Sequence, residues 1–150
     1  MATDLILAIL HHFLVFALAG IIAAELVLVR PGLKRDTLAL VGRIDGLYGL
    51  IAMVIILVGA GRVLFGLKGW EFYVTYWAFW AKMAAFVLVG LLSIQPTIRF
   101  MRWRKAAALD PAFAVPDAEI RGVRAFLHAE AAVFIFIPAF AAIMARGVGY

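Results

Sequence analysis

The chain has 150 residues, of which 67% are hydrophobic and 15% are charged, and its mean hydropathy is +1.06. A sequence this apolar cannot expose its side chains to water as a globular domain, so it predicts an integral membrane protein with one domain over residues 1–150. Cysteine is absent, which excludes disulfides, thiolate metal sites and iron–sulfur clusters. The net charge of +5 is typical of the basic residues that flank membrane spans, so nucleic acid is not an expected partner.

The first predicted span, Leu5–Val29, is long enough to cross a hydrocarbon core of roughly 30 Å as one helix. Three polar residues interrupt it, namely His11, His12 and Glu25. A helix turns about 100° per residue, so His11 and Glu25 share one face while His12 points roughly 100° away. Polar groups in lipid normally have partners inside the bundle, so this face is predicted to carry the chemistry. The N-terminus lacks the basic region of a signal peptide, and we expect the helix to be retained.

The second helix is predicted to begin near Asp36 as its N-cap, and its membrane part runs over about Ile44–Leu64. Three glycines near its start, Gly42, Gly46 and Gly49, form a narrow surface on which another helix can pack closely.

The third helix is predicted from Trp70 or Glu71 to about Ser93, and Gln95-Pro96-Thr97 is expected to kink or end it. The aromatic residues in its first half are typical of an interfacial belt. Lys82 lies about eight residues inside this span, where a charged lysine costs ~2.5–3.5 kcal/mol. The fourth helix is predicted to be capped by Asp117, to kink at Pro138 and to end at Arg146.

The distribution of Lys and Arg predicts the orientation of the four spans. The two sides of the membrane differ strongly in their number of basic residues. Ten lie in or beside the first and third connections between spans (Arg30, Lys34, Arg35, Arg43, Arg99, Arg102, Arg104, Lys105, Arg121, Arg124). Three lie on the opposite side (Arg62, Lys68, Arg146). Basic loops stay in the cytoplasm, so both termini are expected outside, which in a bacterium means the periplasmic side of the inner membrane.

Two polar groups are predicted at different depths. At about 1.5 Å per residue, His11 lies about 9 Å and Lys82 about 12 Å below the outer surface, so one ligand can touch both. This predicts a haem-sized cavity in the outer half, lined by His11, Lys82, Trp77 and Trp80. The residues leave three interpretations of His11 open: a hydrogen-bonded structural histidine, a haem ligand, or a ligand of copper or another transition metal.

The second group lies deeper, toward the cytoplasmic side, and comprises Glu25, Arg43, Asp45, His128 and Glu130. Its structural interpretation is that Arg43 and Arg124 pair with the acidic residues near the interface.

Several segments resemble an uncharacterised bacterial family of small predicted membrane proteins over nearly the whole chain. These segments are Leu10-His11-His12, Glu25, Phe72-Tyr73, Phe79-Trp80-Ala81-Lys82-Met83 and Ser93-Ile94-Gln95-Pro96-Thr97-Ile98-Arg99-Phe100. More distantly, the layout is similar to the copper-resistance D membrane proteins and the J-type, haem-dependent protoporphyrinogen IX oxidases.

The oxidases have an early His in the first helix, an Arg opening the second, a Trp-x-x-Lys in the third and an acidic residue in the fourth. The matching residues here are His11 or His12, Arg43, Lys82 after Trp80 with a spacing one residue shorter, and Glu130. The resemblance implies a four-helix fold, b-type haem with a His ligand, and Lys82, Arg43 and Glu130 as catalytic residues.

These observations predict an all-α, four-helix transmembrane bundle that binds haem and acts as an oxidoreductase on a porphyrinogen or with quinone. The alternatives are copper or other metal handling, and a non-enzymatic assembly factor that binds partner helices. Expected partners are membrane lipid, a porphyrin or a quinone, and a second copy of the chain in a homo-oligomer.

Overall fold

The computed structural model describes residues 2–149, which form helices joined by short connections and contain no strand. The helices are α1 (Ala2–Leu28), α2 (Arg35–Phe65), α3 (Gly69–Thr75), α4 (Trp77–Leu109), α5 (Asp117–Phe134) and α6 (Phe136–Arg146). Four segments are long and apolar enough to cross a membrane: α1, α2, α4 and the continuous stretch of α5 and α6. The predicted all-α architecture with four spans is thereby confirmed over the described residues.

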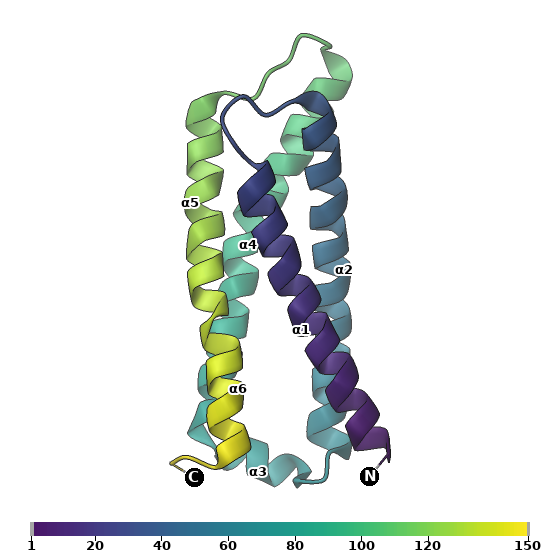
Figure 1. Ribbon diagram of the computed structural model, residues 1–150, viewed down its shortest axis with the longest axis vertical. Coiled ribbons are helices and arrows are strands. Elements are labelled where there is room, and N and C mark those ends of the chain that lie inside the picture. Colours follow the sequence, from purple (N-terminus) through teal and green to yellow (C-terminus); the bar gives the residue numbers. More distant parts are fainter. Residues whose placement is uncertain (1, 150) are drawn as a thin grey trace.

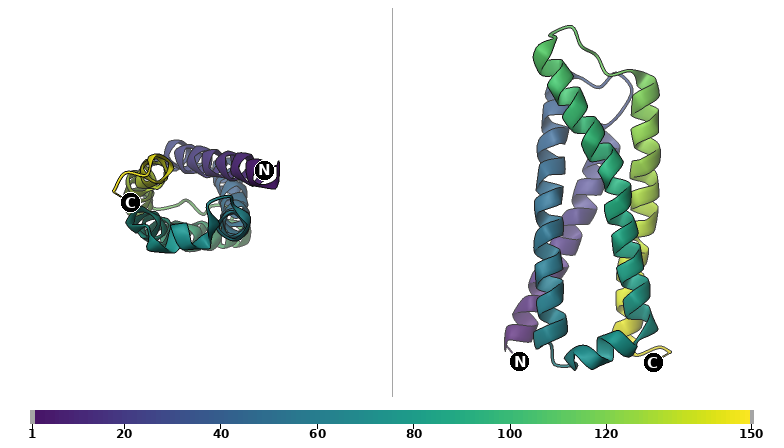
Figure 2. Two further views of the ribbon diagram at one scale, coloured as in Figure 1. Left: turned by 90° about the horizontal axis from the view of Figure 1, so that it is seen from below. Right: turned by 180° about the vertical axis from the view of Figure 1, so that it is seen from behind.

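The four spans run alternately up and down, so that both termini lie at one end of the bundle (Figure 1). We call this the terminal end, and α3 lies across it (Figure 2). The other end, the loop end, carries the connections 29–34 and 110–116. Which end faces the cytoplasm remains a prediction.

The helices pack around two main apolar clusters and present apolar side chains outward. The cluster at the loop end includes Val41, Trp103 and Leu127, and the middle cluster includes Leu18 and Ile55. Large apolar side chains also cover the outside, including Phe13, Phe16, Leu57 and Leu64. In a membrane, these outward side chains contact lipid, so the bundle is apolar on both its inner and outer faces.

The third span differs from the prediction at both of its ends. The chain turns at Tyr76, whose extended backbone separates α3 from α4, so the span begins at Trp77. At the other end, α4 continues through Pro96 to Leu109. Pro96 is buried among its neighbours, and helices inside a bundle tolerate a missing N–H where packing supports the turn.

The fourth span breaks between α5 and α6, at Ile135. Pro138 accounts for this break, because its ring has no N–H and would clash with the carbonyl of Phe134 four residues earlier. Neither predicted acidic cap forms. The N-cap positions are held by Lys34 and Pro116, whereas Asp117 accepts a hydrogen bond from the Gly32 N–H at 3.3 Å and so links the two loop-end connections.

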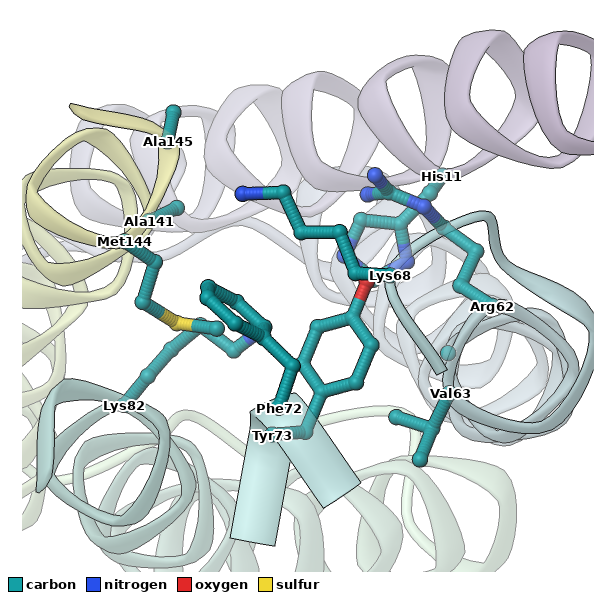
Figure 3. A pocket seen from close by; sticks show the side chains of 11 residues that line it. His11, Arg62, Val63, Lys68, Phe72, Tyr73, Lys82, Ala141, Met144 and Ala145 are labelled. Atoms are coloured by element: carbon teal, nitrogen blue, oxygen red, sulfur yellow. The ribbon is translucent and has the colours of Figure 1, made fainter. Parts of the chain in front are cut away.

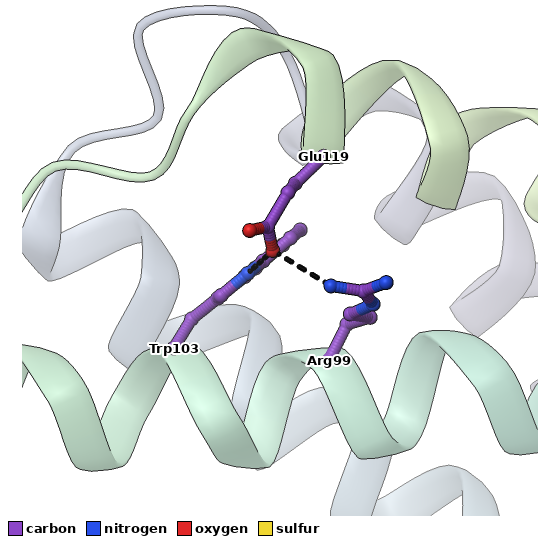
Figure 4. Close-up of polar contacts among 3 residues, drawn as sticks. All are labelled: Arg99, Trp103 and Glu119. Carbon is purple, nitrogen blue, oxygen red and sulfur yellow. Dashed lines mark hydrogen bonds and ion pairs between the residues drawn. The ribbon is translucent and has the colours of Figure 1, made fainter.

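Two further polar contacts tie α5 to its neighbours at the loop end. Glu119 accepts hydrogen bonds from the indole N–H of Trp103 at 2.8 Å and from Arg99 at 3.0 Å (Figure 4). Arg124 donates to the carbonyls of Leu26 at 2.8 Å and Val29 at 2.6 Å. These contacts join α5 to α4 and to the end of α1.

Candidate functional site

Two adjoining cavities occupy the half of the bundle near the terminal end. The first has a volume of about 290 Å³ and is lined by residues of α1, α2, α4 and α6 and by the segment around α3. The second, of about 540 Å³, lies mainly between α2 and α4 and is almost entirely apolar. His11, Gly59, Val63 and Lys82 line both. The structure therefore brings His11 and Lys82, from different helices, to a shared wall.

His11 is held against the backbone of α2. A Cβ atom at position 59 would lie 3.6 Å from His11 Cε1, so the imidazole packs directly on Gly59. The Nδ1 atom of His11 is buried and has no hydrogen-bond partner. A buried imidazole nitrogen without a partner is uncommon. The His11 side chain also lines both cavities, a position from which an imidazole can bind a ligand.

His12 has a different environment from its neighbour. Its ring is exposed on the outside of the bundle, and its Nδ1–H donates a hydrogen bond to the Ala8 carbonyl at 2.6 Å. Between the two histidines that the sequence offered, only His11 lines these cavities.

The first cavity is rich in cations. Arg62, Lys68 and Lys82 line it together with His11, and no aspartate or glutamate does (Figure 3). The Nε atom of Arg62 is buried without a partner. Phe72 and Tyr73 project from α3 into the same space, and the Lys68 Nζ atom lies 4.3 Å from the centre of the Phe72 ring. These cations form no ion pair with the described residues and lie beside an apolar cavity, which favours a ligand with an anionic group and an apolar body.

The sequence did not identify Arg62, Lys68, Phe72 and Tyr73 as site residues. The signal was present for the two cations, which are among the three basic residues predicted at this side of the membrane. The break at Tyr76 turns α3 across the end of the bundle (Figure 2). Phe72 and Tyr73 of this helix line the cavity (Figure 3).

Trp77 and Trp80 lie outside both cavities. Trp77 contacts Tyr76 and Phe140 edge to face, and Trp80 donates its indole N–H to the Val74 carbonyl at 2.9 Å. Both indoles are half exposed on the surface of the bundle. Their predicted role in cofactor binding has no support from this position, which is typical of interfacial tryptophans.

The three residues predicted to be catalytic are not brought together. Lys82 lies in the cavities described above, Arg43 is exposed, and Glu130 is buried near Tyr48 in the other half of the bundle. His128 is also exposed.

The predicted pairing of Arg43 and Arg124 with acidic residues is wrong for the described residues. The described residues form one salt bridge, between Arg99 and Glu119. Arg124 binds backbone carbonyls instead, because the last turn of α1 leaves carbonyl groups without helical partners.

A metal site is absent from the described residues, which contain no group of three His, Cys, Asp or Glu side chains placed to hold a metal ion. A haem requires only one or two axial ligands from the protein, because the porphyrin supplies the others. The unpartnered imidazole nitrogen of His11, the apolar cavity and the three cations fit a haem and its carboxylate groups.

The fold and the cavities define a multi-pass helical membrane protein with an amphipathic site between its helices. The chain belongs to the family described as predicted membrane protein (DUF2214), whose family model matches residues 3–149. No curated protein and no solved structure matches the chain.

Proposed function

We propose that this protein binds haem b in the two cavities near the terminal end, with His11 as the axial ligand. The observation that carries this proposal is the position of His11, whose side chain lines both a cationic and an apolar cavity and whose Nδ1 atom has no hydrogen-bond partner among the described residues. The cavity volumes, about 290 and 540 Å³, together fall within the range of roughly 300–1,000 Å³ that is usual for ligand sites.

The charge distribution supports one orientation of such a ligand. Carboxylate groups favour the side of Arg62, Lys68 and Lys82, since a carboxylate there gains charge-assisted hydrogen bonds. An apolar ring system favours the space between α2 and α4, which apolar side chains line. Lys82 lies at the boundary between these two environments, where it is suited to hold an anionic group or to donate a proton to a bound substrate.

Haem, when bound, supplies one-electron redox chemistry, so we propose an oxidoreductase that acts on a porphyrinogen or a quinone. The distant similarity to the J-type protoporphyrinogen oxidases supports this substrate class. We further propose that the protein resides in the bacterial inner membrane with its terminal end, and therefore the cavities, on the periplasmic side.

The visible absorption spectrum of the purified full-length protein tests the haem proposal. We expect a Soret band in protein from haem-replete cells, and we expect His11→Ala to lose it. His12→Ala is the matched control, because His12 is the adjacent imidazole but faces outward, and this variant should keep the band. The proposal fails if the wild-type protein is colourless and takes up no haem on reconstitution, or if both variants retain the same spectrum.

A second measurement separates haem binding from enzymatic activity. Expression in a strain that lacks protoporphyrinogen oxidase should restore growth, and Lys82→Ala should abolish the rescue. Haem binding without rescue would leave a haem protein and contradict this oxidase activity.

A further inference from the structure

Three carboxylic acids lie inside the bundle, away from the cavities of His11 and Lys82. Glu25 on α1 is 3% exposed, Asp45 on α2 is 9% exposed and Glu130 on α5 is 1% exposed. They lie close enough for electrostatic repulsion between Glu25 and each of the other two, and between Asp45 and Glu130. We call these three residues the carboxyl cluster.

The carboxyl cluster has no cationic partner. No Lys, Arg or His nitrogen among the described residues lies within 4.0 Å of these carboxyl groups. Arg43 and His128, which are the nearest candidates in the sequence, are exposed, and Arg124 on α5 donates to the carbonyls of Leu26 and Val29. One oxygen of Glu25 and one of Glu130 are buried with no hydrogen-bond partner among the described residues.

Neutral polar groups, not cations, surround the cluster. The Thr97 hydroxyl on α4 donates a hydrogen bond to Asp45 at 2.7 Å. The Tyr48 side chain on α2 interacts with both Glu130 and Ser93 of α4. The polar neighbours therefore come from α2 and α4 and carry hydroxyl groups, which can pass protons.

Three negative charges cannot persist together in the buried interior of a membrane bundle. A carboxylate in the membrane interior loses its hydration, and each further carboxylate nearby adds repulsion. Two ways of removing charge remain: a bound cation or bound protons. The three carboxyl groups do not converge into a group that could hold a metal ion. Protons, which can be held by carboxyl groups singly, are the occupant that this arrangement favours.

A third cavity extends from Asp45 of the cluster toward the loop end, and Glu25 and Glu130 lie outside its lining. It has a volume of about 450 Å³, lies between α2 and α4, and is lined by Asp45, Tyr48, Ser93 and Thr97. Arg104, close to the loop end, borders it as well. Gly46, Gly49 and Gly90 leave this space open, since a Cβ atom at each of them would meet nothing within 4 Å. At Gly42, in contrast, the Arg104 side chain packs directly on the helix backbone. A cavity with several polar groups and this volume has room for water.

We propose that Glu25, Asp45 and Glu130 form a proton-exchange site, and that the third cavity connects this site to water at the loop end. The occupant is the proton, which moves between carboxyl oxygens, the hydroxyls of Tyr48 and Thr97, and water. The site is separate from the cavities of His11 and Lys82, and it does not depend on haem binding.

Infrared spectroscopy of the full chain in lipid nanodiscs tests the site. A protonated carboxyl group has a C=O stretching band that shifts when H₂O is replaced by D₂O. At neutral pH we expect such a band in the wild-type protein and a loss of intensity in Glu130→Gln and Glu25→Gln. Glu71→Gln is the control, because Glu71 is an exposed glutamate on α3 outside the cluster. The proposal is overturned if the wild-type band is absent, or if neither cluster variant reduces it.

The rate at which the carboxyl C=O band shifts after transfer to D₂O tests whether the third cavity is the route for proton exchange. Gly46→Leu adds a side chain in the wall of the third cavity, and a Cβ atom there meets nothing within 4 Å, so the helix can accept it. We expect exchange to become several-fold slower. Gly20→Leu is the control, because Gly20 has equal space on α1 but lines none of the three cavities. Equal exchange rates in the two variants would rule out the third cavity as the route.

Discussion

Arg124→Ala removes a contact that closes the end of α1. The last four carbonyls of a helix have no amide partner in the helix itself, and α1 carries no basic residue in its last turn. Arg124 on α5 supplies both the missing hydrogen-bond donors and the missing positive charge, because its guanidinium donates to the carbonyls of Leu26 and Val29. The substitution therefore leaves two acceptors without partners at the place where α1 meets α5.

The magnitude follows from the number of bonds and from burial. A hydrogen bond with one charged partner contributes ~1.5–3 kcal/mol. Val29 is fully buried, so water does not easily replace the lost donor, whereas Arg124 itself is partly exposed. We expect a loss of about 3 kcal/mol for the two bonds, which reduces the ratio of folded to unfolded protein about a hundredfold.

The assay is equilibrium unfolding in mixed micelles with increasing dodecyl sulfate, followed by tryptophan fluorescence and by circular dichroism. Arg121→Ala is the matched control, because Arg121 lies one turn earlier on α5 and makes no hydrogen bond or ion pair among the described residues. We expect the control to stay within about 0.5 kcal/mol of wild type. If Arg124→Ala is no less stable than Arg121→Ala, the two carbonyl contacts do not stabilise the fold and the argument is refuted.

Three further predictions concern other parts of the bundle. Trp103→Phe removes the hydrogen bond to Glu119, so we expect the free energy of unfolding to fall by about 1 kcal/mol and the thermal unfolding temperature to fall with it. Glu119→Gln should have a smaller effect because glutamine retains an acceptor oxygen. Equal stability of Trp103→Phe and wild type would contradict this prediction. Gly59→Leu should weaken haem uptake, measured by titration, because its side chain enters the space in front of the His11 ring; unchanged uptake would place the ligand elsewhere. Single cysteines at Tyr150 and within Ala106–Val115, introduced into a chain that has none, should be labelled from opposite sides of the membrane, and periplasmic access to the second would reverse the proposed orientation.

The number of membrane spans could be predicted from the sequence because it depends on the local composition of each stretch of chain. A helix that crosses the hydrocarbon core needs about twenty apolar residues whatever its neighbours are, and four such stretches are visible in the chain. The shared position of His11 and Lys82 was also accessible, since the rise per residue of a helix is constant and relates sequence distance to depth. The structure places both residues in the walls of the same two cavities.

The direction of side chains around each helix was decided only by the tertiary structure. Rotation and crossing of helices depend on packing across the whole bundle, so the sequence did not show that His12, Arg43 and Trp80 face outward. The break at Tyr76 was likewise not evident from the sequence, whereas the break at Ile135 follows from Pro138, where a kink was predicted.

The partners of the buried charges were likewise settled by packing. Arg124 and Glu130 lie on the same helix, α5, and opposite charges attract, so pairing was the natural expectation. In the folded chain, the end of α1 brings unsatisfied carbonyls to Arg124, and a guanidinium that binds these carbonyls is no longer available to Glu130. The sequence thus determined which charges are inside the membrane, whereas the approach of helices distant in sequence determined which of them are paired.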